Sequence, residues 1–318
     1  MILIVGGAGY IGSHTAKYLN QKQESLLVFD NLSTGHEKFV KWGTFVKGDL
    51  ANKEEIRQCF NEHKIDAVMH FSAFANVGDS VNDPSGYYEN NVVNTKHLLD
   101  VMSEFGVKTL IFSSTCAVYG VPEKLPLTED HPFKPVNPYG WSKLMVERLL
   151  HDYDRAYGLK SVCLRYFNAA GASLDGDLYE DHSPETHLIP LVLAAIHGKR
   201  DQLKIFGSDY ETRDGTCIRD YIHVNDLAKA HYLALQYLRE GGKSEAFNLG
   251  NGDGYSVKEV IETAEKVTCK ACPSVMTERR EGDPGILIGS SDKAKRILGW
   301  EPEIPGLEEI VASVKMPE

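Results

Sequence analysis

The sequence predicts an α/β fold in which a doubly wound parallel sheet carries helices on both faces. Short apolar runs alternate with helical segments through the first half of the chain, and a glycine string follows the first run. Helix-length connections allow right-handed crossovers between parallel strands. We therefore expect a Rossmann-like sheet with a smaller C-terminal α/β domain that binds substrate.

The expected elements follow in chain order. Ile2–Val5 is a short apolar run that ends in Gly6-Gly7, which predicts a buried strand. Tyr10–Asn20 is predicted to be a helix because its apolar residues recur on one side. The same criteria predict strands at Leu26–Phe29, Phe45–Val46, Ala67–His70, Thr109–Ser113 and Ser161–Arg165, and helices at Lys53–Glu62, about Tyr87–Phe105 and about Tyr139–Tyr157. Pro122–Pro138 is rich in proline and charge, which is typical of a surface loop.

A change in composition and in the length of the predicted elements after Phe167 suggests a second domain. Asp175–Glu185 is acidic and turn-rich, and the elements that follow are shorter. The best partition is a first domain at residues 1–166 and a smaller domain at residues 167–318. Strands near Ile222 and Phe247 are expected to return to the first sheet, so the second domain is discontinuous.

Composition excludes several classes of function. The 318 residues carry a net charge of −11, which repels nucleic acid and anionic membranes. We expect neither a signal peptide nor a membrane helix, because the apolar start has no basic leader and no apolar span of about 20 residues. Six cysteines, mostly in apolar runs, favour reduced thiols and a cytoplasmic location. Cys269 and Cys272 form a lone C-x-x-C with no second pair and no histidine at ligand spacing, so no metal site is predicted.

The glycine string indicates a dinucleotide site. Gly6, Gly9 and Gly12 lie between the first strand and the first helix, where a tight turn and a close approach to pyrophosphate exclude a Cβ. The N-terminus of the helix provides free N–H groups for the phosphates. Asp30 ends the second strand, where a carboxylate binds the ribose hydroxyls and repels the extra phosphate of NADP. The expected cofactor is NAD.

A second constellation predicts hydride chemistry. Tyr139 and Lys143 stand at i, i+4, which places both side chains on one face of a helix. A tyrosine titrates near pH 10, and a nearby ammonium favours the phenolate that a base needs. The spacing is common by chance, but it follows a dinucleotide motif and a strand that leads into Ser113, Ser114 and Thr115.

Longer blocks carry a resemblance to a known family. The chain resembles the UDP-glucose (UDP-galactose) 4-epimerases of the extended short-chain dehydrogenase/reductase group. The blocks are Gly6–His14, Asp30-Asn31, His70-Phe71, Asn90–Val92, Phe112–Tyr119, Pro138–Lys143, Arg165–Asn168, Arg219–Val224, Asn248–Gly250 and Arg280–Asp283. They extend over most of the chain, and those at Arg165 and Arg219 are far more specific than the glycine motif.

The resemblance implies a reaction. Tyr139 would take the proton of the sugar 4-hydroxyl while C4 gives hydride to a tightly bound NAD, and Thr115 would hydrogen-bond the same oxygen. Lys143 would anchor the nicotinamide ribose and tune Tyr139. Return of the hydride to the other face of the 4-keto sugar would interconvert UDP-glucose and UDP-galactose.

The resemblance also implies two sets of binding residues. Those expected to contact NAD are Gly6, Gly9, Tyr10, Ile11, Gly12, Asp30, Asn31, Asp49, Leu50, Phe71, Asn91, Ser113, Tyr139, Lys143 and Tyr166. Arg219 and Arg280 would pair with the diphosphate as charge-assisted donors. The UDP-sugar is further expected to contact Thr115, Asn168, His187, Leu188, Phe206, Tyr221, Asp283 and Leu287.

Three positions depart from the family pattern. Ala75 stands where some relatives have a lysine near the cofactor phosphates. His187 replaces an asparagine that often contacts the nucleotide. Leu287 lies at the position that limits sugar size, where a tyrosine would leave less room, so UDP-N-acetylhexosamines are a further expected substrate class.

Alternative functions remain at this point. A nucleotide-sugar 4,6-dehydratase or a decarboxylase would carry an acidic residue after the catalytic hydroxyl, whereas Thr115 is followed by Cys116-Ala117. A non-catalytic NAD-binding regulator would lose the tyrosine or the lysine, and a plain dehydrogenase would release NADH. The resemblance also implies a homodimer through the helices at Tyr87–Phe105 and Tyr139–Tyr157; the second is apolar beyond one face at Leu144, Val146, Leu149 and Leu150.

Overall fold

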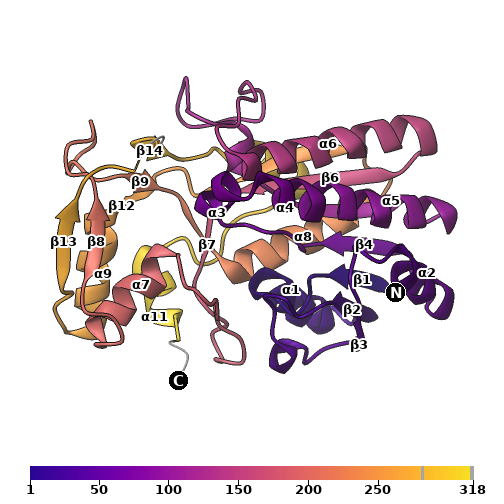
Figure 1. The fold of residues 1–318 in the computed structure, drawn as a ribbon, viewed down its shortest axis with the longest axis horizontal. Helices are drawn as coiled ribbons and strands as arrows, with labels where there is room; N and C mark the ends of the chain where they lie inside the picture. The colour runs from indigo at the N-terminus through magenta and orange to yellow at the C-terminus, as the bar shows by residue number, and fades with distance from the viewer. Residues whose placement is uncertain (281–282, 316–318) are drawn as a thin grey trace.

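A seven-stranded parallel sheet forms the larger part of the molecule (Figure 1). The computed structural model describes residues 1–280 and 283–315. The strands run in the order β11-β6-β5-β4-β1-β2-β3. Their bounds are β1 Ile2–Val5, β2 Leu26–Asp30, β3 Thr44–Lys47, β4 Ala67–His70, β5 Thr109–Thr115, β6 Lys160–Tyr166 and β11 Glu245–Leu249.

Both faces of this sheet are covered by helices, because its central strands are apolar on both sides. Ile2 and Ile4 of β1 face a core that reaches α1 (Tyr10–Gln21), α8 (Val224–Arg239) and α10 (Asp292–Leu298). Leu3 and Val5 face the opposite core, which is closed by α2 (Lys53–Glu62), α5 (Asn94–Glu104) and α6 (Pro138–Tyr157). The fold class predicted from the sequence is confirmed.

The direction of the strand order reverses between β1 and β4. From β1 the chain moves to β2 and β3 on one side, whereas β4, β5 and β6 follow on the other. In open α/β sheets such a switch point leaves a crevice at the carboxyl ends of the strands, where ligands bind. The two crevice strands end at Val5 and His70.

One predicted helix is divided in the structure. The single helix expected at Tyr87–Phe105 consists of α4 (Pro84–Tyr88), a π-helical turn at Glu89–Val93 and α5. A π turn inserts one residue into the helical repeat and re-aims the side chains around it. Here it contains Asn91, whose side chain bonds the chain after β4 through the N–H and C=O of Phe74.

The smaller part lies beyond the carboxyl edge of the main sheet (Figure 1). Its core is formed by α7 (Leu188–Ile196), α9 (Val257–Thr268), α11 (Leu307–Ser313) and β8 (Leu203–Phe206). β8 pairs with β13 (Ser274–Thr277), and β9 (Ile218–Arg219) lies between β12 (Tyr255–Ser256) and β14 (Ile286–Leu287).

The chain passes between the two parts several times. β11, which contains Phe247, joins the edge of the main sheet beside β6. The strand near Ile222, β10 (Tyr221–His223), instead pairs with β7 (Asn168–Ala170) in a separate two-stranded sheet, so its expected return to the first sheet is wrong. Among the described residues no helix is both long and apolar enough to cross a membrane.

Candidate active site

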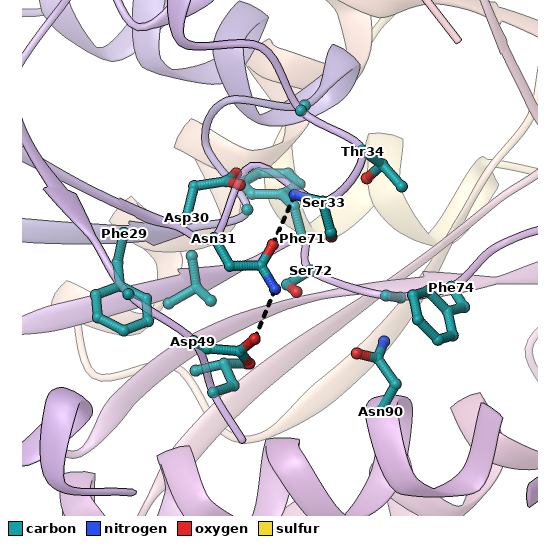
Figure 2. Close-up of a pocket in the computed structure, with 17 residues that line it drawn as sticks. Phe29, Asp30, Asn31, Ser33, Thr34, Asp49, Phe71, Ser72, Phe74 and Asn90 are labelled. Atoms are coloured by element: carbon teal, nitrogen blue, oxygen red, sulfur yellow. Dashed lines mark hydrogen bonds between the residues drawn. The ribbon is translucent and has the colours of Figure 1, made fainter. Parts of the chain in front are cut away.

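The crevice at the switch point is a pocket lined by the loops after β1, β2, β3 and β4 (Figure 2). Seven residues expected to contact a cofactor lie on its wall: Gly6, Gly9, Asp30, Asn31, Asp49, Leu50 and Phe71. The glycine turn leaves no space for side chains. A Cβ on Gly6 would lie 2.6 Å from Ser72 N, and one on Gly12 would lie 2.3 Å from Gly6 O. The backbone itself therefore forms this wall.

Acidic groups form the floor of the pocket. Asp30 is 8% exposed, and its two carboxylate oxygens accept from the N–H groups of Ala8 and Leu32 at 2.9 and 2.8 Å. Asn31 donates to Asp49 at 2.9 Å and accepts from Ser33 N, as the dashed lines in Figure 2 show. These bonds hold the three polar side chains at the strand ends, where ribose hydroxyls and an adenine could be bound.

The sequence missed several lining residues. They are Phe29, Ser33, Thr34, Gly35, Ser72, Ala73, Phe74 and Asn90. Most of them directly follow β2 or β4. Their position after the carboxyl ends of predicted strands could therefore have identified them as pocket residues. Conversely, Tyr10 and Ile11 do not line this pocket: the Tyr10 phenol donates to Gly171 O and ties α1 to the loop after β7.

Thr115, Tyr139 and Lys143 meet at the same edge of the sheet. Thr115 is the last residue of β5, and Tyr139 lies in the first turn of α6, which Asn137 caps by accepting from Gly140 N. Lys143 follows one turn later, with its Nζ 6.0 Å from the centre of the Tyr139 ring. Its ammonium donates to Ser113 O at 2.9 Å.

Burial governs the charge states of this group. Desolvation raises the pKa of Tyr139 to about 12, against the opposing hydrogen bond with Thr115. Desolvation also lowers the pKa of Lys143 to about 7, although the carboxylate of Glu147 opposes that shift. In the protein alone burial thus keeps the pKa of Tyr139 above its usual value, although Lys143 lies one turn away. A positive charge beside the phenol would lower that pKa.

Neighbouring side chains hold the start of α6 in place. Ser142 of α6 donates to Tyr139 O at 2.7 Å and accepts from Asn91 of the π turn at 3.0 Å. Ser113 and Tyr166 share a hydrogen bond between their hydroxyls, and Tyr166 stands opposite Thr115 in the β5–β6 register. Asn91, Ser113 and Tyr166 therefore surround the tyrosine and lysine from three different elements.

A second group of expected site residues lies on the facing sheet. Arg219 of β9 pairs with Asp283, Nη2 to Oδ1 at 2.5 Å, and stands opposite Leu287 of β14. Leu287 packs against a cluster that contains Cys116 and Phe167. Cys116 directly follows Thr115, and it is influenced by the charge of Arg219, so the segment after β5 connects the two groups.

The other substrate candidates are more dispersed. Arg280 stacks on Phe206, with its guanidinium carbon 4.0 Å from the ring centre. Asn168 stands opposite Tyr221 in register, and its amide donates to Asp220 O at 2.9 Å. His187 caps α7 and Leu188 begins it, and His187 lies in a cluster with Glu180 and His182 rather than beside Arg219. Within the Arg280–Asp283 block, residues 281 and 282 lie outside the described part.

The pocket fits NAD. Its wall is backbone that a Cβ would obstruct, which suits a pyrophosphate, and its buried carboxylate suits an unphosphorylated ribose. Ala75 is exposed and adds no cation.

All six cysteines are free thiols.

Comparison with known proteins agrees with this geometry. The family described as "NAD dependent epimerase/dehydratase family" matches residues 2–250. A UDP-glucose 4-epimerase from Halalkalibacterium halodurans is 54% identical over 98% of this chain and 93% of that protein.

Solved structures are similar over nearly the whole chain. A UDP-glucose 4-epimerase from Brucella ovis in complex with NAD has a TM-score of 0.97 and 48% identity, covering 98% of this chain and 96% of that one. A UDP-Glc/GlcNAc 4-epimerase from Campylobacter jejuni has a TM-score of 0.86 and 43% identity, covering 98% and 97%.

Proposed function

Because the chain belongs to the NAD dependent epimerase/dehydratase family, we infer that it interconverts UDP-glucose and UDP-galactose at sugar C4. The observation that carries this inference is the group of Thr115, Tyr139 and Lys143 at the sheet edge that also holds the dinucleotide pocket. Arg219 influences Cys116, the residue after Thr115, and we propose that the substrate occupies the space between Arg219 and this group. The sugar-diphosphate would lie in that space, with its reacting carbon at the tyrosine.

Each residue of this group has a distinct role in the proposed reaction. Tyr139 takes the proton of the 4-hydroxyl, and Thr115 holds the phenol and the sugar oxygen in line. Lys143 places its ammonium beside the ring and the cofactor ribose. NAD, when bound, supplies the hydride acceptor and the positive charge that a phenolate at this buried position requires. Return of the hydride to the other face of the 4-keto sugar would complete the interconversion.

Separate sets of residues are proposed to bind NAD and the UDP-sugar. Gly6 and Gly9 of the pocket, with Gly12 behind them, would hold the pyrophosphate of NAD, and Asp30 would hold its adenosine ribose. Arg219 and Arg280 bind the diphosphate of the UDP-sugar as charge-assisted donors. In this proposal NAD binds at the main sheet, which includes β11 from the second half of the chain, and the nucleotide end of the UDP-sugar binds the smaller part.

A second substrate class is favoured by Leu287. This residue is partly buried and packs against the cluster of Cys116 and Phe167, and Cys116 directly follows Thr115. A leucine leaves room that a tyrosine would fill, and the Campylobacter jejuni protein, 43% identical to this chain, is described as a UDP-Glc/GlcNAc 4-epimerase. We propose that UDP-N-acetylhexosamines are also accepted.

We further propose a homodimer that works in the cytoplasm. Trp141 and Met145, one turn apart on α6, are 42% and 41% exposed, and Val93 of the neighbouring π turn is 37% exposed. α5 packs beside α6, so both helices can meet their copies in one bundle. Six free thiols suit a reducing compartment.

A coupled assay tests the proposed function. The purified protein receives UDP-galactose without added NAD, and formation of UDP-glucose is followed for the wild type, Tyr139→Phe and Tyr157→Phe. Tyr157 lies at the exposed end of the same helix and is the matched control. We expect kcat to fall about 10²–10⁴-fold in Tyr139→Phe, as for loss of a general base, and to stay unchanged in the control. No conversion even with added NAD, or steady release of NADH, would contradict an epimerase.

A further inference from the structure

Four metal-ligand side chains converge in the loop between β7 and α7. They are Glu180, His182, Glu185 and His187, and one potential ligand atom from each lies within 4.8 Å of all the others. The Nδ1 atoms of His182 and His187 lie 3.1 and 2.7 Å from Glu180 Oε1. The same atoms lie 3.8 and 3.1 Å from the carboxylate of Glu185.

These separations fit a shared ion. Zinc bonds of about 2.0–2.2 Å in a tetrahedron place neighbouring ligand atoms about 3.4 Å apart. Glu180 Oε1 lies 3.1 and 2.7 Å from the two Nδ1 atoms, and His187 Nδ1 lies 3.1 Å from Glu185 Oε1, all near that value. His182 Nδ1 lies 3.8 Å from the other oxygen of Glu185, Oε2. Both histidines present the same ring nitrogen, Nδ1, to both carboxylates, although four residues of the loop separate them in the chain.

A second observation points to a ligand. Glu180 is 5% exposed, and its Oε1 has no hydrogen-bond partner although solvent does not reach it. His182 Nδ1 is equally shielded and also lacks a hydrogen-bond partner. The close approach of the two atoms is therefore an electrostatic contact without hydrogen-bond geometry. A buried carboxylate oxygen without a donor is costly, and a cation at the centre of the group would satisfy it.

We propose that Glu180, His182, Glu185 and His187 bind one zinc ion. Two imidazoles and two carboxylates suit a borderline divalent ion such as Zn²⁺, whereas Mg²⁺ and Ca²⁺ prefer sites made of oxygen alone. Two carboxylates and two neutral imidazoles carry a charge of −2, which the ion neutralises. A metal here departs from the sequence-based expectation that the chain has no metal site, because the E-x-H-x-x-E-x-H spacing lies in a segment interpreted as a turn-rich acidic loop.

The site would fasten this loop to the NAD-binding part. His182 contacts the edge of Tyr10 with ring centres 6.2 Å apart, and Tyr10 begins the helix that follows the glycine turn. The loop is also held by Lys38, which pairs with Asp181 at 2.6 Å. An ion on Nδ1 of His187 leaves the proton on Nε2, so the second ring nitrogen becomes a fixed donor at the start of α7. The ion would thus position His187 in one tautomer.

Metal binding can be measured independently of turnover. The holoenzyme is treated with a chelator, passed through a desalting column and titrated with ZnCl₂ against a chromophoric chelator. His182→Gln and Glu185→Gln remove one proposed ligand each. His197→Gln is the matched control, because His197 is exposed at the far end of α7. Cys269→Ser combined with Cys272→Ser tests the C-x-x-C pair, in which only Cys269 is exposed.

We expect one equivalent of zinc per chain. Each ligand variant should bind at least about 100-fold more weakly, since loss of an outer-sphere partner alone costs 10–100-fold. The histidine control and the cysteine variant should bind as the wild type does. Co²⁺ in the wild type should give visible bands of a four-coordinate nitrogen and oxygen site without thiolate charge-transfer absorption.

Other results would overturn the zinc site. They are the absence of a saturable single equivalent in the wild type, affinity unchanged in both ligand variants, loss of binding in the cysteine variant, or a thiolate band with Co²⁺. The wild-type stoichiometry and the cobalt spectrum require no variant, so they decide even if a substitution prevents folding. Because none of these readouts uses a sugar nucleotide, their failure is distinct from failure of the proposed epimerase.

Discussion

Arg219 and Asp283 form an ion pair, Nη2 to Oδ1 at 2.5 Å, although both are proposed to bind the UDP-sugar. The pair joins β9 to the segment that precedes β14. A diphosphate that binds Arg219 must share its guanidinium with this carboxylate or displace it. The ion pair therefore holds the arginine side chain in one place before a nucleotide binds.

Replacing Arg219 with lysine should weaken substrate binding more than it slows the reaction. Lysine keeps the charge but loses the planar fork that bonds two phosphate oxygens. A lost charge-assisted bond costs about 1.5–3 kcal/mol, which corresponds to roughly 10–150-fold in KM for UDP-galactose. Steady-state kinetics check this. Arg213→Lys, at an exposed ion pair with Glu259, should leave KM unchanged, and an unchanged KM in Arg219→Lys would remove the diphosphate role.

The stability of the protein should rise with pH because burial lowers the pKa of Lys143. Its pKa falls from 10.5 to about 7 on folding, so between these values the unfolded chain binds more protons and stability rises with pH. The cost of the buried charge is complete below pH 7. Lys143→Met should therefore raise the Tm of nucleotide-free protein by about 3–6 °C at pH 6, for a net gain of roughly 2 kcal/mol.

The stabilisation by Lys143→Met should shrink as the pH rises from 7 toward 10, because the folded wild type is then neutral at this position and no longer buries a charge. Thermal unfolding followed by circular dichroism at several pH values measures it. Destabilisation at pH 6, or a gain that does not change with pH, would show that the ammonium is not penalised by burial. The same variant should lose most of its turnover, because the ammonium beside Tyr139 is gone.

Asp30 should determine the choice of cofactor. Its buried carboxylate is proposed to bind the ribose hydroxyls of NAD and to repel a phosphate there. Asp30→Asn keeps a polar group of the same shape but removes the charge. We expect the amount of NAD that co-purifies to fall and NADP binding to rise by about tenfold or more, measured by fluorescence titration. Equal NADP affinity in the wild type and the variant would exclude this role.

Leu287 should control which sugars are accepted. Leu287→Tyr fills space beside Cys116 and Phe167, so it should lower kcat/KM for UDP-N-acetylgalactosamine by roughly 10–100-fold more than for UDP-galactose. Leu287→Met, which conserves volume, is the control and should change neither substrate by much. Failure of the wild-type protein to convert UDP-N-acetylgalactosamine, while it converts UDP-galactose, would rule out the wider substrate range.

Local patterns predicted the sheet because burial on both faces leaves little freedom. The short length of apolar runs such as Ala67–His70 favours buried strands, and the structure places β4 at those residues. The glycine turn was equally clear, since the Cβ of any other residue at Gly12 would collide with Gly6 O. Features that depend on a residue and its immediate neighbours are accessible from the sequence.

Features that depend on contacts between distant segments were missed. The π turn at Glu89–Val93 follows from bonds between Asn91 and Phe74, which no helical periodicity encodes. β10 pairs with β7, which brings Tyr221 opposite Asn168 although about fifty residues of chain separate them. The apolar pattern of β10 predicts a strand but does not indicate which strand it pairs with. The cluster around Glu180 was overlooked for the same reason: its residues read as a polar loop until the loop folds back on itself.

The central claim is that hydride leaves C4 and returns to C4 within one active site. Its most direct test uses UDP-galactose deuterated at C4, converted by the wild-type protein and analysed by mass spectrometry and proton NMR, with unlabelled substrate in D₂O as the companion experiment. We expect UDP-glucose that retains the deuterium at C4, with none taken up there from D₂O. Loss of the label to solvent, its appearance at another carbon, or accumulation of NADH with oxidised product would contradict the epimerase.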